Sequence, residues 1–113
     1  MKQESKIIIQ NFIDYLYSDS QKCEFKCGGW NYDNTIYDFI DFCYNNDIIL
    51  EYDSAQERRY LQQKNIEEMS IDEIKKYLYV IFNGERFASG MIAQSISNNK
   101  LKKALEKLAT YFD

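Results

Sequence analysis

The eight residues NGERFASG, at positions 83–90, contain the charged pair best suited to chemistry in this chain. Arg86 has a planar guanidinium that could bind a carboxylate or a phosphate through two hydrogen bonds. Glu85, directly before it, could act as a base next to such an anion. Together they would form the site of a small ligand-binding domain or enzyme, with Arg86 as the anion anchor.

The same segment could instead be architectural, and this is the interpretation that we favour. Gly84 would end one helix, and the Glu85 carboxylate would be stabilised by the unpaired N–H groups at the start of the next. Arg86 would hydrogen-bond the carbonyls that end the preceding helix. Phe87 would be buried in the core, and Gly90, inside the second helix, would let another helix approach closely.

Asp38 and Asp41 are one helical turn apart and are expected on the same face of a helix. Two carboxylates at this spacing could bind a divalent cation or work as an acid–base pair, although a solvated helix face explains them as well. Tyr37 and Tyr44 fall outside the apolar stripe of the same segment, and tyrosine is favoured at protein interfaces. With Glu51, these residues form a candidate surface for binding a partner protein.

Three cysteines and the absence of histidine limit the possible metal and nucleophilic chemistry. Cys23, Cys27 and Cys43 could give three thiolates to zinc, with a carboxylate such as Asp33 completing the site, but buried or half-buried thiols are commoner. A cysteine nucleophile is not expected, because the chain lacks the histidine that usually activates one. We therefore predict no catalytic residue, no metal and no cofactor.

Apolar residues recur at helical spacing along most of the chain, and the helices that they predict must position these side chains. Asp53 is expected to cap the third helix, and Ser70-Ile71-Asp72-Glu73 matches a capping box that begins the fourth. The expected helices cover residues 5–17, 34–44, 54–64, 71–82, 87–96 and 101–112.

Two segments lack this periodicity. Residues 18–32 contain Gly28 and Gly29 and are predicted to be irregular. Residues 48–52, IILEY, are β-prone but too few to define a sheet. The predicted fold class is all-α: a compact bundle of about five or six helices in a single domain, 1–113, with at most a short β-prone segment near residues 48–52.

A helix, the GERF-x-x-G segment, a short helix, an asparagine-rich turn and a leucine-rich helix follow one another in this chain. This order resembles a family of short bacterial domains of unknown function with a Gly-(Glu/Asp)-Arg-Phe-x-x-Gly signature. The matching positions are Gly84, Glu85, Arg86, Phe87 and Gly90. The stretch around Trp30 and residues 37–42 and 52–53 are also similar, so the resemblance covers most of the chain after about residue 25.

The resemblance implies a compact helical module and brings no activity with it. The chain departs from the family pattern at Asn83, where the family tends to have a basic residue, and at Ser54 and Glu57, where it tends to have tryptophans. If those residues formed a site in the family, this chain has lost part of it.

Charge is distributed unevenly along the chain, whose formal net charge is −4. Residues 33–73 contain eleven acidic and three basic residues, whereas residues 74–113 contain seven basic and three acidic ones. The two parts could attract each other within the fold. Alternatively, the acidic part could attract a basic protein or imitate the phosphates that such a protein normally binds.

Membrane insertion and direct nucleic-acid binding are not expected. No apolar run approaches the roughly 20 residues of a membrane-spanning helix, and the start of the chain does not look like a signal peptide, so a cytoplasmic location is predicted. A basic stripe on the last helix would favour nucleic acid, but the net negative charge opposes phosphate backbones. The stripe consists of Lys100, Lys102, Lys103 and Lys107.

These observations favour a non-enzymatic protein-interaction module. Its narrower form is a small acidic inhibitor from a phage or another mobile element, such as an anti-CRISPR protein, which occupies the basic groove of a nucleic-acid-binding defence protein of the host. The alternative is the small ligand-binding domain or enzyme that uses Arg86 as its anion anchor. The oligomeric state does not follow from the residues.

Overall fold

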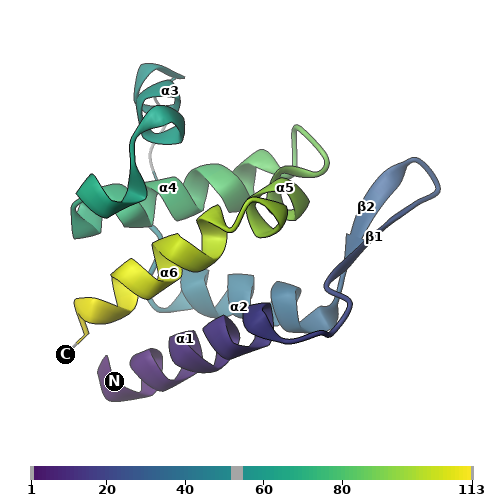
Figure 1. Ribbon diagram of the computed structural model, residues 1–113. Helices are drawn as coiled ribbons and strands as arrows, with labels where there is room; N and C mark the ends of the chain where they lie inside the picture. Colours follow the sequence, from purple (N-terminus) through teal and green to yellow (C-terminus); the bar gives the residue numbers. More distant parts are fainter. Residues whose placement is uncertain (1, 52–54, 113) are drawn as a thin grey trace.

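The computed structural model describes residues 2–51 and 55–112, without the side chains of residues 2, 3 and 55. This part of the chain forms six α-helices, one short 3-10 helix and one β-hairpin (Figure 1). The elements are α1 (Lys2–Tyr17), β1 (Cys23–Lys26), β2 (Gly29–Tyr32), α2 (Asn34–Asn45), α3 (Ala55–Gln63), η1 (Ile66–Glu68), α4 (Ile71–Gly84), α5 (Met91–Ser97) and α6 (Lys100–Thr110). The predicted all-α bundle with a short β segment is confirmed.

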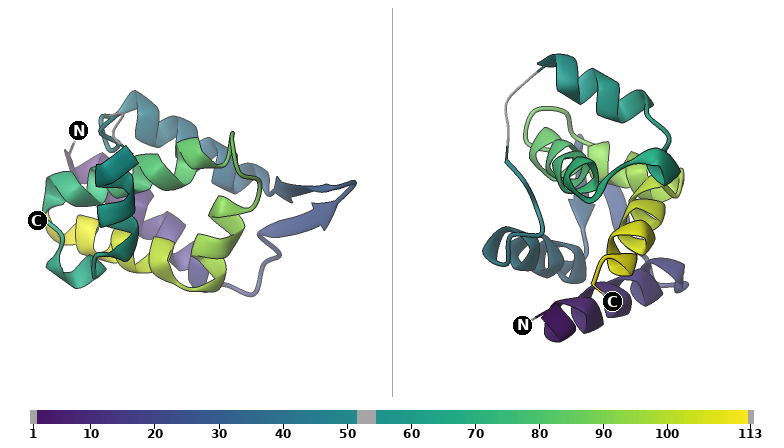
Figure 2. Two further views of the ribbon diagram at one scale, coloured as in Figure 1. Left: turned by 90° about the horizontal axis from the view of Figure 1, so that it is seen from above. Right: turned by 90° about the vertical axis from the view of Figure 1, so that its left-hand side faces the viewer.

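The helices pack around α6, which has α1, α4 and α5 as neighbours. One face of α6 is fully buried and packs against the apolar faces of the surrounding helices. Such faces form because apolar residues recur three or four positions apart along each helix. The two ends of the chain lie at one end of the bundle, and the β1–β2 hairpin projects from the other (Figures 1 and 2). The fully buried residues of α6 are Leu101, Ala104, Leu105 and Leu108.

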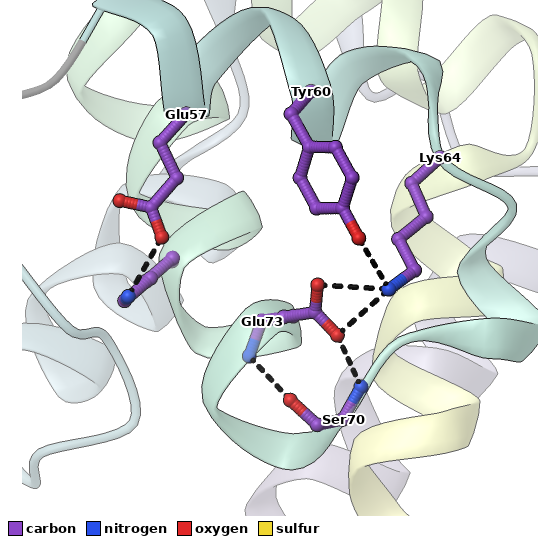
Figure 3. Close-up of polar contacts among 6 residues, drawn as sticks. Glu57, Tyr60, Lys64, Ser70 and Glu73 are labelled. Atoms are coloured by element: carbon purple, nitrogen blue, oxygen red, sulfur yellow. Dashed lines mark hydrogen bonds and ion pairs between the residues drawn. The ribbon is translucent and has the colours of Figure 1, made fainter.

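The capping box predicted at the start of α4 is present (Figure 3). The Glu73 N–H donates to the Ser70 hydroxyl at 3.2 Å, and the Ser70 N–H donates to the Glu73 carboxylate at 3.0 Å. Lys64, just after α3, adds an ion pair to the same carboxylate at 2.9 Å. The backbone N–H of Ser70 is the main cause of a lowered Glu73 pKa, followed by Lys64. The Asp53 cap predicted for α3 lies outside the described residues.

The prediction that residues 18–32 are irregular holds for residues 18–22 and is wrong for residues 23–32. Cys23–Lys26 and Gly29–Tyr32 pair as antiparallel strands in which Phe25 lies opposite Trp30. Cys27 and Gly28 connect them with φ values of 55° and 81°. Positive φ at both central residues is what a two-residue type I′ hairpin turn requires. The pattern missed was two short runs separated by exactly two residues, the second of them glycine.

The β-prone run near residues 48–52 forms no strand over residues 48–51, and residue 52 lies outside the described part. Ile48 and Ile49 are buried in the core instead. The Leu50 N–H donates to the Lys75 carbonyl of α4 at 3.4 Å. These apolar residues therefore anchor the loop after α2 to the bundle. Their hydrophobicity reflects burial in the core and does not require a β-strand.

Candidate functional site

Glu85 joins three elements of the fold at what we call the Glu85 junction, formed by Tyr32, Glu85, Gly90, Ile92 and Ala93. The residue lies at the end of α4, and its side chain reaches the start of α5. One carboxylate oxygen, Oε2, accepts from the Gly90 N–H at 2.7 Å, and the other, Oε1, accepts from the Ile92 N–H at 2.8 Å. The carboxylate thus satisfies two N–H groups that have no partner within α5.

The hairpin is tied to the same carboxylate through Tyr32, the last residue of β2. The Tyr32 hydroxyl donates to Glu85 Oε1 at 2.7 Å and accepts from the Ala93 N–H at 3.1 Å. Burial, followed by the hydrogen bond to Glu85, raises the pKa of Tyr32. Because both Glu85 oxygens already accept hydrogen bonds inside the fold, this geometry does not present the carboxylate as a free base.

Gly90 allows the hairpin to approach α5. Its φ is 100°, and a Cβ built on it would lie 2.8 Å from the Trp30 indole nitrogen. The backbone N–H of Trp30 also donates to the Ser89 hydroxyl at 3.2 Å. Gly90 was predicted to lie inside a helix and to permit a second helix nearby, which is wrong: it precedes α5, and its close neighbour is the Trp30 ring. The spacing of apolar residues alone could not reveal this contact between the hairpin and the turn.

Two further predictions for the GERF segment are wrong. Phe87 is 82% exposed and is not a core anchor, because the chain leaves α4 after Gly84 in a turn closed by the Phe87 and Ala88 N–H groups donating to the Gly84 carbonyl. Arg86 is exposed too, and within the described residues its side chain makes no hydrogen bond to the carbonyls that end α4. The turn points both side chains away from the bundle.

Four of the predicted binding residues, Tyr37, Asp38, Asp41 and Tyr44, lie on exposed positions of α2. We call these four residues the α2 face. The opposite side of α2 buries Ile36, Phe39 and Cys43, as expected for helical periodicity. Within the described part of the chain, neither Asp38 nor Asp41 forms an ion pair or a side-chain hydrogen bond. The α2 face is therefore acidic and aromatic, and its carboxylates are free to meet a partner.

The α2 face is near the other predicted site residues at both ends. Tyr37 and Tyr32 have ring centroids 6.1 Å apart, in an edge-to-face arrangement that connects the face to the Glu85 junction. Near the other end, burial raises the pKa of Tyr44, the nearby Tyr79 and Glu51 raise it further, and Arg86 opposes them. Glu51 is exposed as well. The structure thus brings Glu51 and Arg86 within electrostatic reach of Tyr44, although they were singled out for different reasons.

A groove of about 530 Å³ lies beside the Glu85 junction, between the hairpin and α5. The ligand-binding alternative predicted a pocket around residues 84–91, and Trp30 and residues 88–91 do line this groove. Neither Glu85 nor Arg86 lines it. The predicted anion anchor and the groove are therefore separate features, which weakens the enzyme alternative.

The three thiols occupy different environments. Cys43 is buried, Cys23 is half-buried, and Cys27 is exposed in the hairpin turn. Burial raises the pKa of both Cys23 and Cys43, which disfavours the reactive thiolate. Among the described residues, no group of histidine, cysteine, aspartate or glutamate side chains is arranged to hold a metal ion.

The basic stripe on α6 is partly used within the fold. The Lys102 ammonium lies 3.8 Å from the centroid of the Tyr17 ring, and Lys107 donates to the Glu67 backbone carbonyl. Glu106, on the same helix, accepts from the Tyr17 hydroxyl at 3.1 Å. In the part of the chain that the structure describes, no helix is both apolar and long enough to span a bilayer.

Comparison with protein families places these features in a wider group. A family model described as Family of unknown function (DUF6508) matches residues 7–113. The chain belongs to this family. The match includes the hairpin, the Glu85 junction and the α2 face, so all three lie within the family's domain. Searches of the curated proteins and of the solved structures gave no significant match.

Proposed function

We propose that this DUF6508 domain is a non-enzymatic interaction module whose α2 face binds a basic surface of a cytoplasmic partner protein. The observation that carries this proposal is the exposed, unpaired acidic face of α2. All exposed positions of helix α2 are polar, acidic or tyrosine, and none carries a positive charge. The exposed positions are Asn34, Thr35, Tyr37, Asp38, Asp41, Tyr44 and Asn45.

Two carboxylates elsewhere in the fold are paired with lysines. Glu73 pairs with Lys64, and Glu57 pairs with Lys76 at 2.8 Å, so these acidic residues are partly neutralised inside the molecule. The negative charges of Asp38 and Asp41 are not neutralised by an ion pair within the described residues. An unneutralised acidic face attracts a basic partner over several ångströms and orients it before contact.

The tyrosines give the α2 face contact area as well as charge. Tyr37 and Tyr44 are seven residues apart, two helical turns, and both are exposed. A tyrosine buries a large, rigid surface while its hydroxyl still finds a hydrogen bond, which is why this residue is enriched at interfaces. Together with the two aspartates, they suit a partner that presents arginine or lysine around an apolar patch.

The narrower proposal is that the partner is a nucleic-acid-binding protein whose basic groove the domain occupies, as a small phage or mobile-element inhibitor, for example an anti-CRISPR protein, would do. The charge distribution supports this, since eleven of the acidic residues lie between positions 33 and 73. We also propose that the Gly84-Glu85-Arg86-Phe87-x-x-Gly90 segment is an architectural signature of the family, supported by the structural roles of Glu85 and Gly90.

The test is affinity capture of the tagged protein from a lysate of its own host, at low and moderate salt. We expect the wild type to retain one stoichiometric protein that salt releases, and Asp38→Lys/Asp41→Lys to lose it. Glu67→Lys/Glu68→Lys changes the net charge equally at two other exposed acidic positions and is expected to retain the partner. Equal losses in both variants would show that net charge, and not the α2 face, drives capture.

The inhibitor proposal has its own measurement. The captured protein is mixed with labelled nucleic acid, and increasing amounts of the domain are added. Release of the nucleic acid by the wild type but not by Asp38→Lys/Asp41→Lys is expected. A ternary complex that contains both the nucleic acid and the domain would contradict occupation of the basic groove and would leave the interaction module in place.

A further inference from the structure

An apolar groove of about 310 Å³ runs between α1 and α2, beside the α2 face. Its floor is aromatic: the rings of Phe12 and Phe39 stack in parallel with centroids 3.9 Å apart. Ile8 on one wall is 39% exposed, and Phe42 on the other is half-buried. The full lining consists of Ile8, Asn11, Phe12, Thr35, Asp38, Phe39 and Phe42.

The groove follows from how α1 and α2 are supported. α1 packs against α6, while α2 lies beside α1 at the edge of the bundle, as the right-hand view of Figure 2 shows. The stacked phenylalanines connect the two helices below the surface. The apolar side chains above them, Ile8 and Phe42, remain partly exposed to solvent. Each uncovered apolar side chain exposes surface whose burial against a partner would be favourable.

Asp38 belongs both to this groove and to the α2 face. Asp38 lines the groove on its α2 side, and Asp41 follows one turn later on the same helix. On α1, Glu4 is exposed one turn before Ile8. None of the residues that line the groove is basic. An apolar floor with an acidic rim is complementary to an apolar stripe flanked by lysine or arginine.

We propose that this groove binds the apolar face of a basic amphipathic helix from the partner protein, an inference that rests on the proposed function of the α2 face. A groove between two helices offers side chains and no unpaired backbone edge, so an inserted helix with anchors at positions i, i+3, i+4 and i+7 fits it better than an added strand. The anchors would contact Ile8, Phe12 and Phe42, and the basic flank would pair with Asp38.

A second copy of the chain is a poorer occupant on charge grounds. Packing this groove on itself would bring Asp38 of each copy toward the acidic rim of the other. The basic helix α6 cannot serve either, because its apolar residues are fully buried in the core. The buried residues concerned are Leu101, Leu105 and Leu108.

The probe is a synthetic helical peptide with leucine at i, i+3, i+4 and i+7 and lysine at the remaining positions, titrated into the ¹⁵N-labelled protein. We expect amide shifts to concentrate at Ile8, Asn11 and Asp38. A control peptide of the same composition, with leucine and lysine rearranged so that no apolar helix face forms, is expected to bind about tenfold more weakly or not at all.

Ile7 and Ile8 form a matched pair for mutation, because both are exposed isoleucines on α1, at 59% and 39%, and only Ile8 lines the groove. Ile8→Lys is expected to weaken peptide binding about tenfold, whereas Ile7→Lys stays within about twofold. A second pair avoids any folding defect from a charge: Asn11→Trp would fill the groove, and Gln10→Trp, outside it, would not.

Three results would overturn the inference. The first is equal weakening by Ile7→Lys and Ile8→Lys. The second is peptide shifts centred on the groove around Trp30 instead. The third is shifts at Ile8 that depend on protein concentration without peptide, which would make a second copy the occupant. If host capture still depends on Asp38 and Asp41 while the peptide avoids the groove, the proposed function survives and only this inference fails.

Discussion

The Glu85 junction and the α2 face each combine carboxylate with tyrosine, yet the fold uses the carboxylates in opposite ways. At the junction, the Glu85 carboxylate accepts three hydrogen bonds and connects the hairpin, α4 and α5. On the α2 face, Asp38 and Asp41 make no such bonds within the described residues. Residue type alone did not distinguish the two regions. A carboxylate's internal partners therefore indicate whether it serves the fold or remains available to bind another molecule.

Removing the Glu85 carboxylate should give the largest effect on stability. Glu85→Ala leaves two backbone N–H groups and the Tyr32 hydroxyl without their acceptor, so we expect a loss of about 3 kcal/mol in the free energy of unfolding. Urea denaturation measures it. Arg86→Ala, at the next position but exposed, should change stability by less than about 0.5 kcal/mol. Comparable losses from both variants would mean that the GERF pair acts as one unit and would remove the contrast.

Gly90→Ala should have the next largest effect. The methyl group would be strained at φ 100° and would also press on the Trp30 ring, so we expect a loss of about 2 kcal/mol. Gly28→Ala is the control, because φ is 81° there and no atom lies within 4 Å of the added Cβ. It should cost about 1 kcal/mol, from backbone strain alone. If the two variants are equally stable in thermal melts, the contact between the hairpin and α5 contributes little.

A smaller effect is expected from pH at the capping box. The lowered pKa of Glu73 means that its contribution to stability is fully present above the ordinary glutamate pKa and is lost as pH falls through the lowered value. Between about pH 5 and pH 3, Glu73→Gln should therefore lose less stability than the wild type. The measurement is the urea midpoint at several pH values, with Glu68→Gln as the control. An identical acid profile for wild type and Glu73→Gln would contradict it.

The smallest effect on stability is expected at the α2 face. Asp38→Asn/Asp41→Asn removes two charges that make no ion pair in the described part, so unfolding should change by less than about 0.5 kcal/mol. Thermal denaturation of this variant and of Glu85→Ala under the same conditions compares the stability contributions of the two regions. A loss above about 1 kcal/mol would show that these carboxylates support the fold after all.

The helices and the capping box could be predicted from the sequence because their determinants are local. Apolar residues three or four positions apart define a buried face whatever lies opposite, and Ser70 and Glu73 find each other within one turn. The hairpin could have been predicted from the positions of Cys27 and Gly28, although a cysteine is a rare choice for a turn residue with positive φ. The α2 face was also predictable as polar, since exposure on a helix follows from periodicity.

The contacts of Glu85 and Gly90 in the GERF segment could not be predicted from the sequence, because they join elements that are far apart in the chain. Whether Glu85 would bind a ligand or join elements depended on Tyr32, 53 positions earlier, reaching its carboxylate. Whether Gly90 allowed close approach of a helix or of the hairpin depended on the position of the Trp30 ring. Periodicity describes what one element buries, whereas these partners belong to different elements. Their distances are fixed only when the whole core packs, which is why the sequence determined the elements and the fold determined the roles of Glu85 and Gly90.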